Sequence, residues 1–219
     1  MRSRLLAALL LGLFVLPSIG QAQRAEDPRV EIALPDVSAL AVEGPQVRAR
    51  SMLSDSRVRE ALRNGFAVRL HFRVELWSTE GWFNSLAGRT EWEIVVRREG
   101  LEEKYLVTRL FPDGRRVTSG PFATVAETEE DVARGVRAPI TPPRRNERYY
   151  YNAVCEVETL SVSDLDELER WLRGEAGPAV RGERNPGTAL TRGLRTLFVR
   201  LLGGDGNRYE GRTVTFFVG

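Results

Sequence analysis

The twelve residues FAVRLHFRVELW, at positions 66–77, carry the clearest structural signal in the chain. Apolar side chains alternate there with a mostly polar set, at the period of two that a β-strand has. The apolar set is Phe66, Val68, Leu70, Phe72, Val74 and Leu76, and the opposite set is Ala67, Arg69, His71, Arg73, Glu75 and Trp77. The pattern predicts a long antiparallel strand that buries one face and leaves the other toward water.

Shorter alternating stretches on both sides extend this prediction to the whole domain. They predict strands at residues 30–34, 46–53, 89–98, 103–110, 115–119, 148–160 and 209–218. Residues 66–119 should form a meander, because turn residues such as Pro112-Asp113-Gly114 separate these strands. The strand at 148–160 should turn Cys155 into the core. We therefore expect a mainly β protein, an antiparallel β-sandwich of about seven or eight strands in one domain.

Capping residues predict short helices at the edges of this sandwich. The segments are 57–63, 124–133 and 164–173, each preceded or opened by a residue that can cap a helix N-terminus. A longer amphipathic helix is predicted at about 188–202. Its polar positions include Arg192, Arg195 and Arg200, and it contains no acidic residue. Such a helix either lies on an anionic membrane surface or covers one end of the core, and the sequence leaves both alternatives open.

The first 22 residues have the composition of an export signal. Arg2 and Arg4 precede an apolar run at 5–16, and Gly20 and Ala22 form a small-x-small cleavage signal. An uncleaved anchor is the alternative, but a membrane span needs about 20 apolar residues. We expect a signal peptide over 1–22, a tether and short strand over 23–45, and a single β-rich domain over 46–219, located in the periplasm or cell envelope.

Charge and composition exclude several classes of function. The chain has 32 basic and 30 acidic residues, and loss of the leader would lower its formal net charge from +2 to 0. Since the two signs are also interleaved, we expect no nucleic-acid partner. One Cys and one His exclude a disulfide framework and a cysteine-cluster or polyhistidine metal site. We expect neither a metal nor another cofactor.

No catalytic constellation is visible in the sequence. His71 is the only plausible general base, but it stands among charged residues on the polar face of its strand. A nucleophilic mechanism needs an activated Ser or Cys beside it, whereas Cys155 should face the core. We therefore expect a protein that is not an enzyme. The alternative is an envelope hydrolase or a carbohydrate-binding or carbohydrate-active protein.

Three aromatic residues gather at the end of the first strand and are candidates for surface contacts. Trp77, Trp82 and Phe83 could stack on sugar rings, enter a membrane interface, or close the open end of the core. Together with Arg192, Arg195 and Arg200, they are the residues that we expect to touch a partner. The expected partners are proteins of the envelope, with the membrane surface as a further contact.

Residues 66–82, Trp92 and residues 148–175 resemble a family of exported bacterial proteins, the domain of unknown function DUF4390. The resemblance covers about residues 47–173 and rests on strand patterning and on the helix predicted after Ser163. It implies a β-rich envelope protein of diderm bacteria, and it carries over no activity and no site. On all these grounds we expect a non-catalytic interaction or assembly module.

Overall fold

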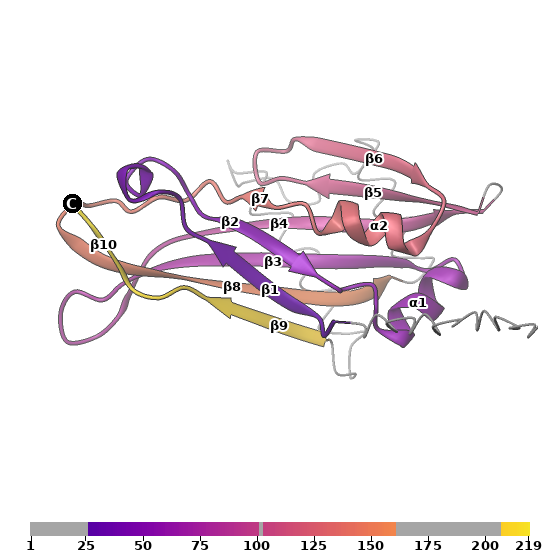
Figure 1. Cartoon of the computed structure of the whole chain (residues 1–219), viewed down its shortest axis with the longest axis horizontal. Helices are drawn as coiled ribbons and strands as arrows, with labels where there is room; N and C mark the ends of the chain where they lie inside the picture. The colour runs from indigo at the N-terminus through magenta and orange to yellow at the C-terminus, as the bar shows by residue number, and fades with distance from the viewer. Residues whose placement is uncertain (1–25, 101–102, 161–206) are drawn as a thin grey trace, which may run out of the picture.

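The computed structural model describes residues 26–100, 103–160 and 207–219 (Figure 1). In these parts of the chain, ten strands form two antiparallel sheets, and two short α-helices accompany them. The mainly β sandwich predicted from the alternating segments is confirmed. The leader at 1–22 and the helices predicted at 164–173 and 188–202 lie outside the described residues.

The large sheet is built around one central strand, β3 (Ala67–Ser78). Its other strands are β4 (Ser85–Glu99), β5 (Lys104–Leu110), β6 (Arg116–Phe122), β8 (Glu147–Leu160), β9 (Asn207–Arg212) and β10 (Phe216–Val218). Their order is β10-β8-β3-β4-β5-β6, and β9 also pairs with β8. The strands β3 to β6 therefore form the predicted meander, while β8 lies on the other side of β3 (Figure 1).

The small sheet contains β1 (Arg29–Ala33), β2 (Gln46–Arg50) and β7 (Val136–Arg137), in the order β1-β2-β7. A 3₁₀ turn, η1 (Val37–Ala39), lies between its first two strands. The strand β1 approaches β9 closely: a Cβ atom on Gly211 would lie 2.5 Å from the Val30 carbonyl oxygen. Glycine at this position therefore lets the edges of the two sheets meet.

The core lies between the two sheets and follows the predicted faces. The alternate residues of β3 from Val68 to Leu76 are buried, and the Phe72 ring stacks on Trp92 with centroids 5.1 Å apart. Cys155 of β8 points into the same core, as predicted, together with Tyr149 and Tyr151. Each of these buried side chains adds apolar contact, which contributes most of the stability of such a fold.

Phe66 departs from its prediction as an inward-facing strand residue. Its backbone N–H donates to the Ala61 carbonyl, and the Gly65 N–H donates to that of Leu62. These bonds end α1 (Ser56–Arg63) in a Schellman motif, with Gly65 at a φ of +82°. Phe66 therefore completes the helix end, and its side chain is 39% exposed.

The predicted last strand, 209–218, is also different in the structure. It is divided into β9 and β10, which both pair with β8. At the break, the Thr213 hydroxyl accepts a hydrogen bond from the backbone N–H of Tyr151 at 2.9 Å. The side chain thereby replaces a backbone partner. This division and the two-residue β7 explain why ten strands stand where seven or eight were predicted.

The helix α2 (Val125–Val132) is fixed by buried charges that the sequence analysis did not identify. Thr124 caps its N-terminus as predicted, by accepting from the Glu127 N–H at 3.1 Å. On its inner side, Asp131 is 1% exposed and accepts from Arg109 of β5 at 2.8 Å and from the Ser119 hydroxyl at 2.7 Å. These bonds join the helix to β5 and β6.

A second carboxylate of α2 holds the chain that follows β2. Glu129 accepts hydrogen bonds from the backbone N–H groups of Met52 and Leu53, at 3.2 and 2.6 Å. Burial raises the pKa of Glu129 above its ordinary value, although these backbone bonds oppose the shift. The helix therefore connects the small sheet with the end of the large one.

Removal of Arg109 should be strongly destabilising, because the buried carboxylate of Asp131 then loses its buried guanidinium partner and keeps only the exposed Arg134, at 2.9 Å. We expect Arg109→Ala to lower the free energy of unfolding by about 3–5 kcal/mol. The matched control is Arg115→Ala, whose ion pair with Asp113 is 61% and 63% exposed and should change stability by less than about 1 kcal/mol. Urea unfolding of both variants measures this difference, and equal stabilities would contradict the account.

The thiol of Cys155 should be inert in the folded protein. It is 0% exposed, and burial raises its pKa far above the ordinary range, so the reactive thiolate is scarce at neutral pH. We expect a thiol reagent to label Cys155 only after denaturant is added. Rapid labelling of the native protein would mean that β8 presents the opposite face to the core.

Candidate functional site

The outer face of the large sheet carries a connected row of charges. On β3, the side chain of Arg69 contacts Glu158 at 2.7 Å and Glu93 at 3.3 Å. The neighbouring His71 lies 3.5 Å from Glu93 through Nδ1 and 3.8 Å from Glu91 through Nε2. The row therefore crosses β8, β3 and β4, as the register of the three strands requires.

This row is a structural network and supplies no nucleophile to His71. The imidazole lies beside two glutamate carboxylates, which can orient it but are not the activated Ser or Cys that a nucleophilic mechanism needs. Cys155 lies on the opposite face of the sheet, within the core. Among the described residues, no group of three or more His, Cys, Asp and Glu side chains is arranged to hold a metal ion.

The three aromatic candidates occupy two different places in the structure. Trp77 is half-buried on the outer face, where its ring lies parallel to that of Tyr150 at a centroid distance of 6.5 Å. Trp82 and Phe83 lie in the loop between β3 and β4, and their side chains are 98% and 88% exposed. None of the three closes the end of the core. The sequence alone does not distinguish Trp77 from Trp82 and Phe83, because the alternating pattern does not give the length of the turn.

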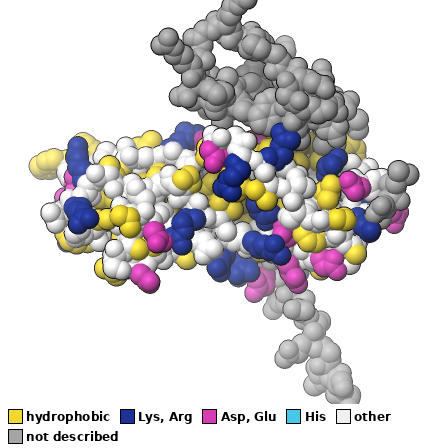
Figure 2. All heavy atoms as spheres, turned by 90° about the horizontal axis from the view of Figure 1, so that it is seen from above, with side chains coloured by type: hydrophobic (Ala, Val, Ile, Leu, Met, Phe, Trp, Pro, Cys, Tyr) yellow, Lys and Arg dark blue, Asp and Glu magenta, His cyan; other side chains and the backbone are white. Residues whose placement is uncertain are grey.

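Trp82 and Phe83 belong to a larger apolar surface, which we call the apolar end. It contains exposed residues of the β3–β4 loop and the start of β4, of the segment around η1 and of the chain around β10: Val37, Val42, Trp82, Phe83, Leu86, Val214 and Phe217. These segments reach the same end of the elongated sandwich, on the left in Figure 1. Figure 2 shows hydrophobic side chains on that end.

Hydrogen bonds hold these segments together. The Thr79 N–H donates to the Arg148 carbonyl at 2.9 Å, and the Arg148 N–H donates to the Glu80 carboxylate at 3.1 Å. The Asn146 N–H donates to the Val218 carbonyl at 2.6 Å. The loop that bears Trp82 and Phe83 is therefore tied at its base to β8, and β8 to the strand of Phe217.

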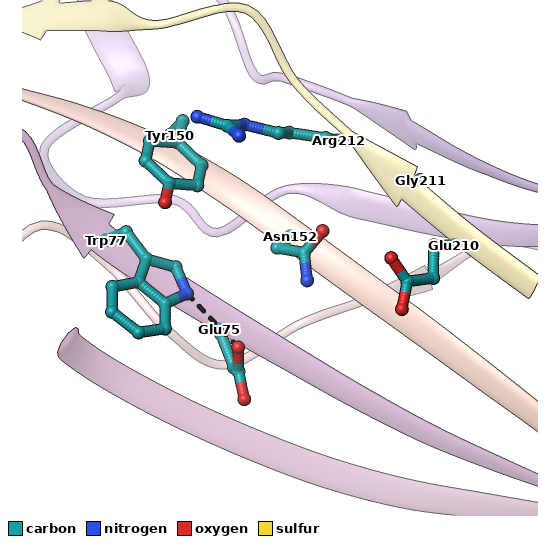
Figure 3. Close-up of a pocket in the computed structure, with 7 residues that line it drawn as sticks. All are labelled: Glu75, Trp77, Tyr150, Asn152, Glu210, Gly211 and Arg212. Atoms are coloured by element: carbon teal, nitrogen blue, oxygen red, sulfur yellow. Dashed lines mark hydrogen bonds between the residues drawn. The ribbon is translucent and has the colours of Figure 1, made fainter. Parts of the chain in front are cut away.

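A hollow of about 360 Å³ lies on the outer face, beside Trp77. Its lining comes from β3, β8 and β9: Glu75, Trp77, Tyr150, Asn152, Glu210, Gly211 and Arg212 (Figure 3). The guanidinium of Arg212 lies 3.7 Å above the Tyr150 ring, and the Trp77 indole N–H donates to Glu75 at 3.1 Å. The sequence analysis identified Trp77 but not the residues beside it, because the pairing register of β3, β8 and β9 cannot be derived from a single sequence.

The remaining candidates, Arg192, Arg195 and Arg200, lie outside the described residues. Within the described residues, no helix combines the length and the apolar character that crossing a membrane requires.

Because the pKa of Glu93 is lowered, the stability of the fold should depend on pH in the acidic range. Burial alone would raise this pKa, but the hydrogen bond from His71 and the charge of Arg69 bring it below its ordinary value of 4.5. A lowered pKa stabilises the fold above pH 4.5, and this contribution is lost as the pH falls through the folded-state value.

Glu93→Gln removes that titration, so the free energy of unfolding of this variant should fall less steeply below pH 4.5 than that of the parent. Urea unfolding between about pH 3 and 7 measures both slopes. The exposed Glu26→Gln variant serves as the control and should follow the parent. Identical slopes for Glu93→Gln and the parent would show that Glu93 does not contribute to the pH dependence of the free energy of unfolding.

Comparison with protein-family models, with curated proteins and with solved structures finds no match for this chain. The resemblance to DUF4390 therefore stays a hypothesis.

Proposed function

We propose that the protein is a non-catalytic interaction module of the cell envelope, which attaches to a lipid surface through its apolar end. The observation that carries the proposal is the exposure of Trp82 and Phe83, at 98% and 88%, in the loop at one end of the sandwich. Export by the leader at 1–22 is part of the same proposal.

Exposure of these two rings to water is unfavourable, and their burial at an interface would be favourable. Full burial of a large apolar side chain contributes about 1.5–3 kcal/mol, and neither ring obtains this contribution within the folded domain. Large exposed apolar side chains that gather at one end of a domain mark an interaction site more often than a single scattered residue does. Trp82 is also suited to a membrane interface, because its indole combines an apolar body with an N–H donor.

The arrangement of the apolar end favours a fluid lipid surface over a rigid partner. Its residues project from loops and strand ends in different parts of the chain, and lipid can adapt to such separate projections. A rigid protein partner would need a surface that matches these projections. The hollow beside Trp77 does not offer a place for such a partner at the apolar end, because it lies on the sheet face and none of the apolar-end residues lines it. The end of the domain should therefore enter the interface as a set of shallow anchors.

The charges near the apolar end are mixed in sign. Arg144 contacts Glu147 at 3.3 Å, and Arg137 contacts Glu43 at 2.6 Å. Because these charges are paired, attraction to anionic lipid should add little, and binding should depend weakly on salt. The predicted helix that bears Arg192, Arg195 and Arg200 would behave in the opposite way, since its charges have one sign.

Co-sedimentation with vesicles tests the proposal. Residues 23–219, which include every described strand, should pellet with vesicles of neutral phosphatidylcholine, and salt should not release them. Trp82→Ser/Phe83→Ser should weaken this binding by about tenfold or more, since two apolar anchors are lost. Val117→Ser, 40% exposed on β6 and outside the apolar end, is the matched control and should bind as the parent does.

Two outcomes would decide against this attachment. Binding that requires anionic lipid and disappears in salt, with no effect of the Trp82 and Phe83 substitutions, would assign the contact to Arg192, Arg195 and Arg200. A protein that stays in the supernatant with every vesicle would remove the membrane and leave an envelope protein as the partner of the apolar end.

A further inference from the structure

We propose that the hollow on the outer face of β3, β8 and β9 binds a pyranose ring of a saccharide. The site is separate from the apolar end, and the proposal goes beyond membrane attachment. It rests on the combination of an aromatic platform with polar groups of both charge signs around one cavity of about 360 Å³.

The aromatic platform is formed by residues that are cross-strand partners. Trp77 of β3 pairs with Tyr150 of β8, so their side chains stand next to each other on the outer face. Their rings are parallel within 7° at a centroid distance of 6.5 Å, so the faces of both rings have the same orientation. Arg212 covers the Tyr150 ring, at 3.7 Å from its centroid, and leaves the half-buried indole of Trp77 as the ring that can stack on a ligand.

The hollow exists because the edge strand is interrupted. β9 ends at Arg212 and β10 begins at Phe216, so neither strand extends beside Tyr150. Among the described strands, none therefore pairs with Tyr150 on this side of β8. The next cross-strand row, Glu75, Asn152 and Arg212, forms the polar side of the hollow (Figure 3).

The polar side offers fixed acceptors and donors of both charge signs. Glu75 is held by the Trp77 indole N–H at 3.1 Å and by Arg73 at 3.3 Å. Glu210 is held by Arg208 at 2.8 Å. Each carboxylate therefore has an arginine partner, and the guanidinium of Arg212 adds a donor to the same lining. The Asn152 amide adds one donor group and one acceptor.

These features match the chemistry of a neutral sugar. A pyranose ring with equatorial hydroxyl groups has a flat face of C–H groups, which stacks on an aromatic ring, and a rim of hydroxyl groups, which need both donors and acceptors. A phosphate-bearing ligand would meet two carboxylates of the lining beside the one guanidinium of Arg212, and a purely apolar ligand would leave the polar rim without partners. The volume is within the range of about 300–1,000 Å³ of small-molecule sites.

The test is a titration of the isotopically labelled protein with two soluble probes, cellotetraose and chitotetraose, followed by the indole N–H signals in NMR. At least one probe should shift the Trp77 signal with a dissociation constant in or below the millimolar range. Trp77→Leu keeps an apolar side chain without the flat ring and should weaken binding by about tenfold or more. Asn152→Ala should weaken it as well, while Trp77→Phe should retain part of the affinity.

The controls separate this site from the apolar end. Trp82→Ser/Phe83→Ser should bind the probe like the parent, and Trp77→Leu should still sediment with neutral vesicles. The proposal is overturned if neither probe shifts the Trp77 signal up to about 10 mM, the weak limit of specific binding. It is equally overturned if the Trp82 signal shifts in place of that of Trp77, which would place the sugar on the exposed loop.

Discussion

The pairing of β3 with both β4 and β8 is the interaction on which the other parts of the structure depend. β3 is paired on both sides along most of its length, and its period of two assigns every side chain to one of two faces. A shift of the register by one residue would bring Arg69 and His71 into the core and expose Leu70 and Phe72. The apolar face therefore fixes the register, and the register fixes what stands on the outer face.

The outer face acquires its chemistry from this constraint. The same alternation that buries Leu76 places Glu75 and Trp77 outside, next to Asn152 and Tyr150. Further along the strand it places Arg69 between two glutamates, where the charges satisfy one another. At the end of the strand the chain turns, and its loop carries Trp82 and Phe83 beyond the sheet. One strand thus connects the charge row, the proposed sugar site and the apolar end.

The alternation was sufficient to predict most of the strands and the buried positions of Leu70, Phe72 and Cys155, because a repeating pattern follows burial directly. Contacts that depend on a single pair of residues left no such record. Arg109 stands at an inward position of β5 and would be judged out of place without its partner, Asp131, on α2. Trp77 and Trp82 were grouped because they are close in sequence, although the turn between them carries only one of the two away from the sheet.

The central claim is that the apolar end enters a lipid interface, and ¹⁹F NMR of the protein labelled with 5-fluorotryptophan tests it most directly. Trp82→Phe assigns the Trp82 signal, and a spin-labelled lipid in neutral bicelles reports which rings approach the bilayer. The account predicts strong broadening of the Trp82 signal and none of the signal of Trp92, which is 2% exposed within the core. A Trp82 signal as sharp with the spin label as without it would contradict the claim.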